Sequence, residues 1–464
     1  MSDEIHFGTD GWRAVIAEDF TFDNVRRIAD AAGSVMAADH PGALVLVGYD
    51  TRFEADAFAA VAAGVLASHG LRVRVSDAPL PTPALSWAAD RSEAAGAIML
   101  TASHNPAKYC GFKLKTADGG SAPPEYTKRV EAALPAAPPA AAPGAFETAD
   151  LVSGYLADLK TLVDGEVIRR ANMRVVVDPL FGAGQGYLAR ILRELGVEVE
   201  ELHGEPNPGF GGLHPEPIPP YIDAMRRAVV DGGFPAGFTT DGDADRIGAC
   251  DRHGNFVNPQ RIFSLVLRHL VEDKGMRGNV VKTVTTSVLL DRLCRHFGLT
   301  CESTPVGFKY IYEKMVTSDV LIGGEESGGI GVPSHLRERD GLAMALYLAE
   351  MMATHGKGLD ELVDDLFAIT GPMEYRRVDL RLEQPVMDAF HAAAPTMAPA
   401  SIAGLAVQRV DAFEGVKFFL PDDAWLMLRP SGTEPLVRVY AEAPTMGVVD
   451  DLLAAGQALV RGGA

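Results

Sequence analysis

The sequence is poor in cysteine. Its four cysteines, Cys110, Cys250, Cys294 and Cys301, are scattered and form no C-x-x-C pair. This spacing offers neither a disulfide framework nor a zinc signature, and it is typical of a reducing cytoplasm. No apolar run of about 18 residues occurs, which excludes a membrane-spanning helix. The chain does not open with a basic segment followed by an apolar one, so we expect no signal peptide and a cytoplasmic location.

Positive charge is also scarce. The 42 Lys and Arg residues face 62 Asp and Glu residues, which gives a formal net charge of −20. Such a surface repels phosphate backbones and anionic lipids, so we expect no nucleic-acid partner and no membrane partner. A phosphorylated small molecule would need a local cluster of cations. Hydrophobic residues make up 47% and charged residues 22%, ordinary values for a globular protein that exclude wholesale disorder.

One sequence unit recurs three times in the first three quarters of the chain. Each copy has a β-rich run, a helical stretch ending at Gly, a second β-rich run and, after a Pro, a third. The first runs are 43–50, 173–178 and 279–284; the second are 70–75, 196–200 and 298–302; the third are 95–100, 236–240 and 320–323. This alternation predicts repeated α/β units with mainly parallel strands. The alternative is the general similarity of all α/β proteins.

The fold class that we expect is α/β, with three related α/β domains containing mixed sheets and a smaller C-terminal α+β domain. An Ala/Pro segment at 132–145 cannot form a helix and marks the first boundary. The expected domains are 1–150, 151–252, 253–370 and 371–464. Ligands of such sheets bind beyond the carboxyl ends of the strands, so we expect an active site in a central cleft between the domains.

Three chemically rich loops follow the third run of each copy: 101–106, 241–246 and 324–329. In the second loop, Asp241, Asp243 and Asp245 alternate, so an extended stretch would aim all three carboxylates the same way. A hard cation such as magnesium or calcium would relieve their repulsion. An EF-hand is excluded because its pattern needs Gly at position 246 and Glu at 252, where arginines stand. A polar turn capped by Asp is the alternative.

The first loop offers the hydroxyl of Ser103. We expect its neighbour His104 to point elsewhere, and no G-x-S-x-G elbow surrounds the serine, which weakens a hydrolase interpretation. An ordinary turn is the alternative. Lys113 and Lys115 follow on one face of a short strand. Either could contact a phosphate or transfer a proton, or both could be solvated surface groups.

The segment 429–435, with Arg438 beyond it, combines small residues, two hydroxyls and an arginine. This composition is typical of a phosphate-binding loop, and a plain hairpin turn is the alternative. It lacks the Lys of a Walker A loop, so nucleotide triphosphate hydrolysis is not indicated. The segments 7–13 and 337–341 add further arginines.

Together and in this order, these motifs resemble the α-D-phosphohexomutase family over essentially the whole chain. The matching segments are 7–13, 101–106, 241–246, 324–329 and 429–438. The segments 304–309, 324–328 and 335–341 are most similar to phosphoglucomutases. Some relatives carry His where Phe308 and Gly329 stand here, so the histidine roles of that branch do not transfer. Phosphoglucosamine mutases usually carry Asp-Arg in place of Phe308-Lys309, which counts against glucosamine phosphate as substrate.

The resemblance implies that Ser103 is phosphorylated and that it holds one Mg²⁺ together with Asp241, Asp243 and Asp245. It also implies catalytic roles for Ser103, Lys113 and Arg13. The residues that it implies for substrate binding are Arg246, Lys309, Glu325, Ser327, Arg339, Arg429, Ser431, Gly432, Thr433 and Arg438.

By resemblance, the protein is an isomerase of carbohydrate metabolism that interconverts glucose 1-phosphate and glucose 6-phosphate. The reaction would pass through a phosphoserine enzyme, with glucose 1,6-bisphosphate as intermediate and activator. The alternatives are a phosphomannomutase, a dual-specificity phosphohexomutase, a sugar-phosphate phosphatase and a non-catalytic sensor. We expect a hexose phosphate as ligand and a monomer or homodimer as the assembly.

Overall fold

The computed structural model describes residues 5–8, 10–140, 142–431 and 436–462 of the chain. The chain divides into two compact units, each containing two segments of sequence. The first unit comprises Met1–Asn279 and Gly307–Leu362, and the second comprises Val280–Val306 and Val363–Ala464. The four expected domain boundaries stay a prediction. Along the described chain, no helix is both long and apolar enough to cross a bilayer.

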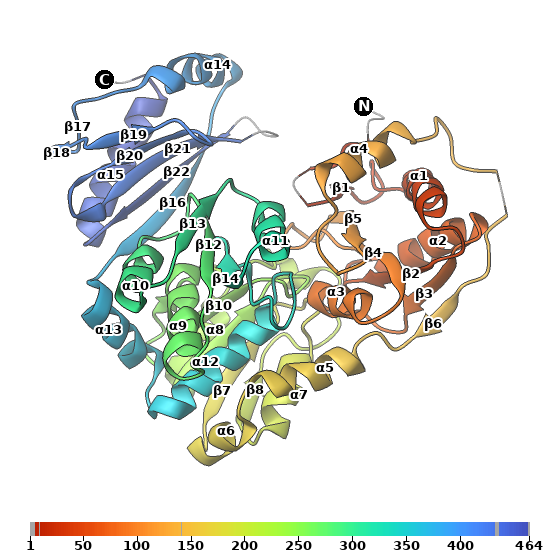
Figure 1. The fold of residues 1–464 in the computed structure, drawn as a ribbon, viewed down its shortest axis with the longest axis horizontal. Coiled ribbons are helices and arrows are strands. Elements are labelled where there is room, and N and C mark those ends of the chain that lie inside the picture. The colour runs from red at the N-terminus through yellow and green to blue at the C-terminus, as the bar shows by residue number, and fades with distance from the viewer. Residues whose placement is uncertain (1–4, 9, 141, 432–435, 463–464) are drawn as a thin grey trace. The chain divides into compact units, whose positions relative to one another are not determined.

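The first unit begins with a six-stranded mixed sheet in the order β1-β5-β4-β2-β3-β6 (Figure 1). Its strands are β1 Trp12–Val15, β2 Leu44–Tyr49, β3 Arg72–Ser76, β4 Ala94–Leu100, β5 Tyr109–Thr116 and β6 Glu147–Ala149. Its helices are α1 Phe22–Asp39, α2 Ala55–Ser68, α3 Thr82–Asp90 and α4 Pro124–Ala132. Strands β2, β3 and β4 are parallel, whereas β5 is antiparallel to both β4 and β1. Helix α4 includes Ala132, the first residue of the segment 132–145, and the rest of that segment contains no helix in its described part, as expected.

Helix packing follows from the small residues on α1 and α2, which lie side by side in Figure 1. The buried face of α2 is mostly alanine, including Ala59, Ala62 and Ala63, which lets the helix approach its neighbours closely. Phe20 packs edge-on against Phe58 at a ring-centroid distance of 4.8 Å. Central strand β2 is apolar on both faces, as expected of a buried parallel strand.

The second sheet of the first unit has the order β11-β10-β9-β7-β8. Its strands are β7 Arg174–Asp178, β8 Glu198–Glu201, β9 Ala236–Thr240, β10 Ile247–Asp251 and β11 Phe256–Val257. The helical segments around it are α5 Ser153–Leu159, η1 Lys160–Leu162, α6 Gly165–Ala171, α7 Tyr187–Glu194, η2 Phe210–Gly212, α8 Asp223–Gly232 and α9 Pro259–Glu272. The order β10-β9-β7-β8 repeats β5-β4-β2-β3, with the same parallel and antiparallel pairings. The predicted internal repeat is therefore confirmed for these two copies.

Two strand pairs of the third copy have the same directions as their counterparts in the other copies. Strands β12 Asn279–Thr283 and β13 Cys301–Thr304 pair in parallel and flank helix α10 Leu289–Phe297. In the first unit, β14 Val320–Gly324 and β15 Ile330–Gly331 form an antiparallel pair. The remaining helices of this region are α11 Phe308–Thr317, α12 Gly341–His355 and α13 Leu359–Thr370.

The second unit ends in an antiparallel sheet in the order β16-β22-β21-β20-β19. Its strands are β16 Glu374–Arg381, β19 Arg409–Asp411, β20 Val416–Phe419, β21 Trp425–Pro430 and β22 Leu436–Ala443, and β17 Ser401–Ile402 pairs with β18 Leu405–Ala406. Helix α15 Met446–Val460 packs on β22, and the other helical segments are α14 Gln384–Ala393, η3 Ala394–Thr396 and η4 Pro421–Asp423. This arrangement confirms the predicted C-terminal α+β domain, and with it the predicted fold class.

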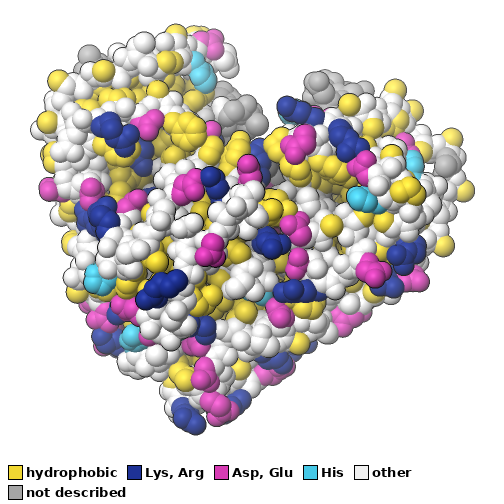
Figure 2. All heavy atoms as spheres, in the orientation of Figure 1, with side chains coloured by type: hydrophobic (Ala, Val, Ile, Leu, Met, Phe, Trp, Pro, Cys, Tyr) yellow, Lys and Arg dark blue, Asp and Glu magenta, His cyan; other side chains and the backbone are white. Residues whose placement is uncertain are grey.

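Acidic and basic side chains are interspersed over the face shown in Figure 2. Many are paired on the surface, as in Arg129 with Asp39 at 2.8 Å. The excess negative charge therefore coexists with buried cations, and Lys113, Lys115 and Arg339 of the first unit are among them.

Candidate active site

The three predicted loops meet within the first unit. The Oγ of Ser103, which follows β4, donates a hydrogen bond of 2.8 Å to Oδ2 of Asp241, which follows β9. Arg246 forms an isolated β-bridge with Gly329, which joins the second loop to the third. Because each loop follows the carboxyl end of a strand in its own repeat, the repeat explains why they converge.

Ser103 sits in a conformation that L-residues rarely adopt. Its φ is 50° and it is 1% exposed. This backbone brings His104 Nδ1 to 3.4 Å from the serine Oγ, so the prediction that His104 points elsewhere is wrong. The contact is long for a hydrogen bond, whereas the bond to Asp241 is short and buried. A strained backbone at a buried hydroxyl is a feature of functional sites.

The three aspartates converge through a turn and not through an extended stretch as predicted. Residues 242–243 form the turn, and Ala244 has a φ of 58°, which curls the chain so that the carboxylates share one side. One oxygen from each of Asp241, Asp243 and Asp245 lies within 4.8 Å of the others, and all three residues are buried. Oδ1 of Asp243 and Oδ1 of Asp245 accept no hydrogen bond. Buried carboxylate oxygens without donors fit a divalent cation with oxygen ligands.

The charges around this triad are unevenly balanced. Burial, together with the carboxylates of Asp243 and Asp245, raises the pKa of Asp241 well above its usual range. Burial would also raise the pKa of Asp243, but the ammonium of Lys113 and the hydroxyl of Thr82 outweigh it and lower that pKa. Burial and repulsion thus disfavour the charged form of Asp241, and a bound cation would favour that form.

Lys113 and Lys115 lie on β5 and are both buried, so their interpretation as solvated surface lysines is wrong. The Nζ of Lys113 is 2.8 Å from Asp243 Oδ2, 2.9 Å from Asp10 Oδ2 and 3.6 Å from Asp245 Oδ2. Burial alone would lower the pKa of Lys113, but these carboxylates raise it. In this state Lys113 holds its proton. Lys115 pairs with the buried Glu338.

Arg339 lies next to the same acidic groups. Its Nη2 is 2.8 Å from Asp245 Oδ2 and 2.9 Å from Asp10 Oδ2, and its Nη1 is 3.6 Å from Glu325 Oε2. Burial would raise the pKa of Asp10, but Lys113 and Arg339 hold it well below its usual range. Asp10 thus links a cation of strand β5 to a cation of the loop before α12. Its place within the N-terminal motif could have revealed it, but we singled out only the arginine of that motif.

The other predicted residues of the first unit border this cluster. Arg13 on β1 donates from Nη1 to Asn105 Oδ1 at 2.7 Å, beside the serine loop. Arg246 donates its backbone N–H to Asp241 Oδ1 at 3.1 Å, and its guanidinium Nε lies 3.9 Å from Asp245 Oδ1. Ser327 is half-buried in the third loop. Positive groups therefore gather here despite the net charge of the chain.

Glu325 begins the third loop and is almost completely buried. Its Oε1 accepts the backbone N–H of Gly307 at 3.1 Å. Burial raises the pKa of Glu325 to about 7, and the nearby Arg339 opposes this increase. The side chain therefore changes charge near neutral pH, and it can either donate or accept a hydrogen bond.

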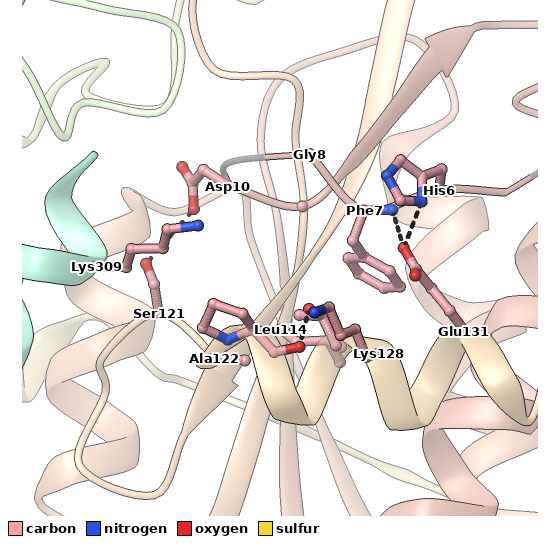
Figure 3. A pocket seen from close by; sticks show the side chains of 13 residues that line it. His6, Phe7, Gly8, Asp10, Leu114, Ser121, Ala122, Lys128, Glu131 and Lys309 are labelled. Carbon is pink, nitrogen blue, oxygen red and sulfur yellow. Dashed lines mark hydrogen bonds and ion pairs between the residues drawn. The ribbon is translucent and has the colours of Figure 1, made fainter. Parts of the chain in front are cut away.

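A cavity of about 220 Å³ adjoins the cluster (Figure 3). Asp10, Ser121 and Lys309 line one end, and His6 and Glu131, which lie 2.9 Å apart, line the other. Lys309 lies beside Asp10 in this view. The cavity offers a polar space next to the buried cations.

The remaining predicted residues lie in the second unit. Arg429 on β21 and Arg438 on β22 are register partners, at the base of the predicted hairpin. Arg429 pairs with Glu414 at 3.4 Å, and Arg438 lies 3.8 Å from Asp379. The backbone N–H of Ser431 donates to Leu436 O at 2.9 Å. Gly432 and Thr433 lie outside the described residues.

Four domain models described as phosphoglucomutase/phosphomannomutase match the chain. They are α/β/α domain I at residues 4–139, domain II at 153–254, domain III at 258–369 and the C-terminal domain at 387–455.

Individual relatives match over nearly their whole length. A phosphoglucomutase/phosphomannomutase from Thermococcus kodakarensis is 32% identical over 442 residues, covering 94% of both chains. A phosphoglucosamine mutase from Frankia alni is 34% identical over 485 residues, covering 98% of both. The crystal structure of a putative phosphomannomutase from Thermus thermophilus has a TM-score of 0.90 and 40% identity, with all of both chains covered.

Proposed function

The chain belongs to the α-D-phosphohexomutase family, and from this premise we propose that it interconverts glucose 1-phosphate and glucose 6-phosphate. Phosphate would pass from Ser103 to the free hydroxyl of the substrate, giving glucose 1,6-bisphosphate. The other phosphate of that intermediate would then return to the serine, after the sugar has reversed its orientation.

The observation that carries the proposal is the 2.8 Å hydrogen bond between Ser103 Oγ and Asp241 within a buried acidic triad. A serine that only stabilised a turn would need neither three converging carboxylates nor the two buried cations beside them. A serine that carries a phosphoryl group uses both, because the cations neutralise its negative charge and the carboxylates can hold a divalent cation that does the same.

The residues that would hold Mg²⁺ are Ser103, through its phosphate, and Asp241, Asp243 and Asp245. Their buried oxygens, three of which accept no hydrogen bond, fit this ion. When bound, the ion would neutralise the phosphoryl oxygens and stabilise the charge that develops on them.

Within this proposal Lys113 handles the proton of the reacting hydroxyl. Its Nζ lies between the carboxylates of Asp243, a member of the triad, and Asp10, and it forms an ion pair with each. It holds a proton in the present arrangement, so it is poised to give one to a departing alkoxide and to recover it in the reverse step. Arg13, Arg246, Lys309 and Arg339 would contact phosphate oxygens.

Glu325 and Ser327 would bind sugar hydroxyls. Glu325 suits this task because its raised pKa allows it to act as donor or acceptor, and the sugar must be held in two orientations. In the second unit, Arg429, Ser431, Gly432, Thr433 and Arg438 would bind a phosphate group, as the small-residue loop suggests.

The identity of the hexose is the finer part of the proposal. The name of the Thermus thermophilus protein favours mannose as second candidate, and the names of the Frankia alni and related proteins favour glucosamine.

The test is kcat/KM for glucose 1-, mannose 1- and glucosamine 1-phosphate, side by side, with glucose 1,6-bisphosphate as activator. Glucose 1-phosphate should have the highest value. A higher value for either other sugar would refute the glucose preference. Release of inorganic phosphate without isomer formation would refute the mutase and identify a phosphatase.

A further inference from the structure

An arginine outside the predicted site binds backbone carbonyl groups of the serine loop. Arg52 follows β2, and its side chain is fully buried. All five N–H groups of its guanidinium are used. Nη2 donates to Ser103 O at 2.6 Å and to Asn105 O at 2.7 Å, and Nη1 donates to Pro106 O at 2.9 Å and Tyr109 O at 2.8 Å. The fifth donor, Nε, binds Asp50 Oδ2 at 3.0 Å.

The backbone N–H of Ser103 is connected to the Arg52–Asp50 ion pair through Thr101. Ser103 N donates to Thr101 Oγ1 at 2.9 Å, and that hydroxyl donates to Asp50 Oδ2 at 2.6 Å. Asp50 is in turn the partner of Arg52. The backbone N–H and C=O of Ser103 thus lead to one buried ion pair, which holds the residue on both sides of its strained φ.

The surroundings leave this ion pair little freedom. The guanidinium lies over the ring of Phe210, with 4.9 Å from Cζ to the ring centroid. The same carbonyl oxygen, Ser103 O, would lie only 2.4 Å from a Cβ at Gly242. The loop is therefore in close contact with both Arg52 and the turn that carries the aspartates, and a small shift of the loop would change the distance from the hydroxyl to the triad.

We propose that Arg52, with Asp50 and Thr101, is a positioning residue that fixes the Ser103 loop in the geometry needed for phosphoryl transfer. The inference rests on the proposed function, because it concerns the nucleophile of that reaction. Arg52 touches no reacting atom. Only a planar group with five donors can satisfy four carbonyls and a carboxylate at once, so lysine cannot replace it.

The decisive variant is Arg52→Lys, which keeps the charge but has three donors on one atom. We expect kcat to fall about a hundredfold with KM little changed, since a misplaced nucleophile loses rate more than affinity. Amide hydrogen exchange of residues 101–110 should become faster, while that of β2 and β4 stays as in the wild type. In Arg52→Ala, added guanidinium ion should restore part of kcat and urea should not.

The matched control is Arg226→Lys, which removes an arginine that donates to another loop carbonyl, Gly254 O, at 2.6 Å. It should leave kcat and the exchange of residues 101–110 unchanged. If Arg52→Lys fails to fold, Thr101→Val tests the same connection at nearly equal volume and should show the same loss of kcat and the same faster exchange.

A folded Arg52→Lys or Thr101→Val variant with wild-type kcat, or with unchanged exchange in the loop, would overturn the inference. A wild-type protein without mutase activity on any hexose phosphate would refute the proposed function instead. The hydrogen-exchange comparison would still decide whether Arg52 holds the loop.

Discussion

Glu325 allows the electrostatics of the site to be tested without substrate. The side chain is 6% exposed, and burial raises its pKa from 4.5 to about 7 in the folded protein. In the unfolded chain it regains its ordinary value. The variant Glu325→Gln keeps the shape of the side chain and the oxygen that accepts the Gly307 N–H, but it cannot ionise.

The sign and the size of the effect follow from linkage. Between pH 4.5 and about 7 the folded protein keeps the proton on Glu325 and the unfolded chain releases it, so this group destabilises the fold as the pH rises. A change of one in pKa is worth about 1.36 kcal/mol. The increase to about 7 therefore lowers the free energy of unfolding by about 3 kcal/mol. This loss of stability is absent below the pKa of the unfolded chain and complete above the pKa of the folded protein.

The assay is urea unfolding of the wild type and of Glu325→Gln in chelator, at a series of pH values from about 4 to about 8. The free energy of unfolding of the variant, relative to the wild type, should rise by about 3 kcal/mol across this range and then level off. Glu18→Gln, at an exposed glutamate of the first unit, is the control for removing one carboxylate and should show no such rise. A constant difference between Glu325→Gln and the wild type would refute the argument.

Three further predictions concern the buried charges. Lys113→Met should lower kcat at least about a hundredfold, and Lys113→Arg should restore substrate binding but not turnover; near-normal kcat in Lys113→Arg would place the base elsewhere. Asp241→Asn should raise the melting temperature in chelator, because it removes one of three carboxylates that repel one another. It should also abolish the increase in melting temperature that Mg²⁺ gives the wild type. A melting temperature that still rises with Mg²⁺ as in the wild type would contradict the metal site. Lys115→Met should destabilise the fold by up to about 3–5 kcal/mol, because buried Glu338 loses the ammonium that pairs with it and keeps only the contacts with Arg339 and Ser121. Adding Glu338→Gln should recover part of this loss in urea unfolding, and no recovery would refute a charge effect.

The repeat was readable from the sequence because it depends on local patterns. Runs of β-branched residues ending at chemically rich loops identified the strands, and the repeat placed Ser103 and the three aspartates together. The geometry within the loops was not readable, because it depends on backbone angles that no spacing reveals. The left-handed residues Ser103 and Ala244 explain both errors, the contact of His104 and the turn of the triad.

The buried cations show a second limit. A lone lysine is most often a solvated surface group, so Lys113 and Lys115 gave no sign of burial before their partners were known. Their partners, Asp10 and Glu338, lie far away in the sequence or in another loop. Arg52 was missed as well, although it follows β2 in the way the predicted loops follow their strands, because a single arginine after a strand is not a recognisable motif.

The central claim is that Ser103 carries the phosphate that is transferred, and one labelling measurement tests it most directly. The protein is loaded with glucose 1,6-bisphosphate labelled with radioactive phosphorus, the labelled peptide is mapped, and unlabelled glucose 1-phosphate is then added. The label should map to Ser103, leave with the sugar as bisphosphate and glucose 6-phosphate, and be absent from Ser103→Ala. Label on another residue, or isomerisation by Ser103→Ala at the wild-type rate, would contradict the claim.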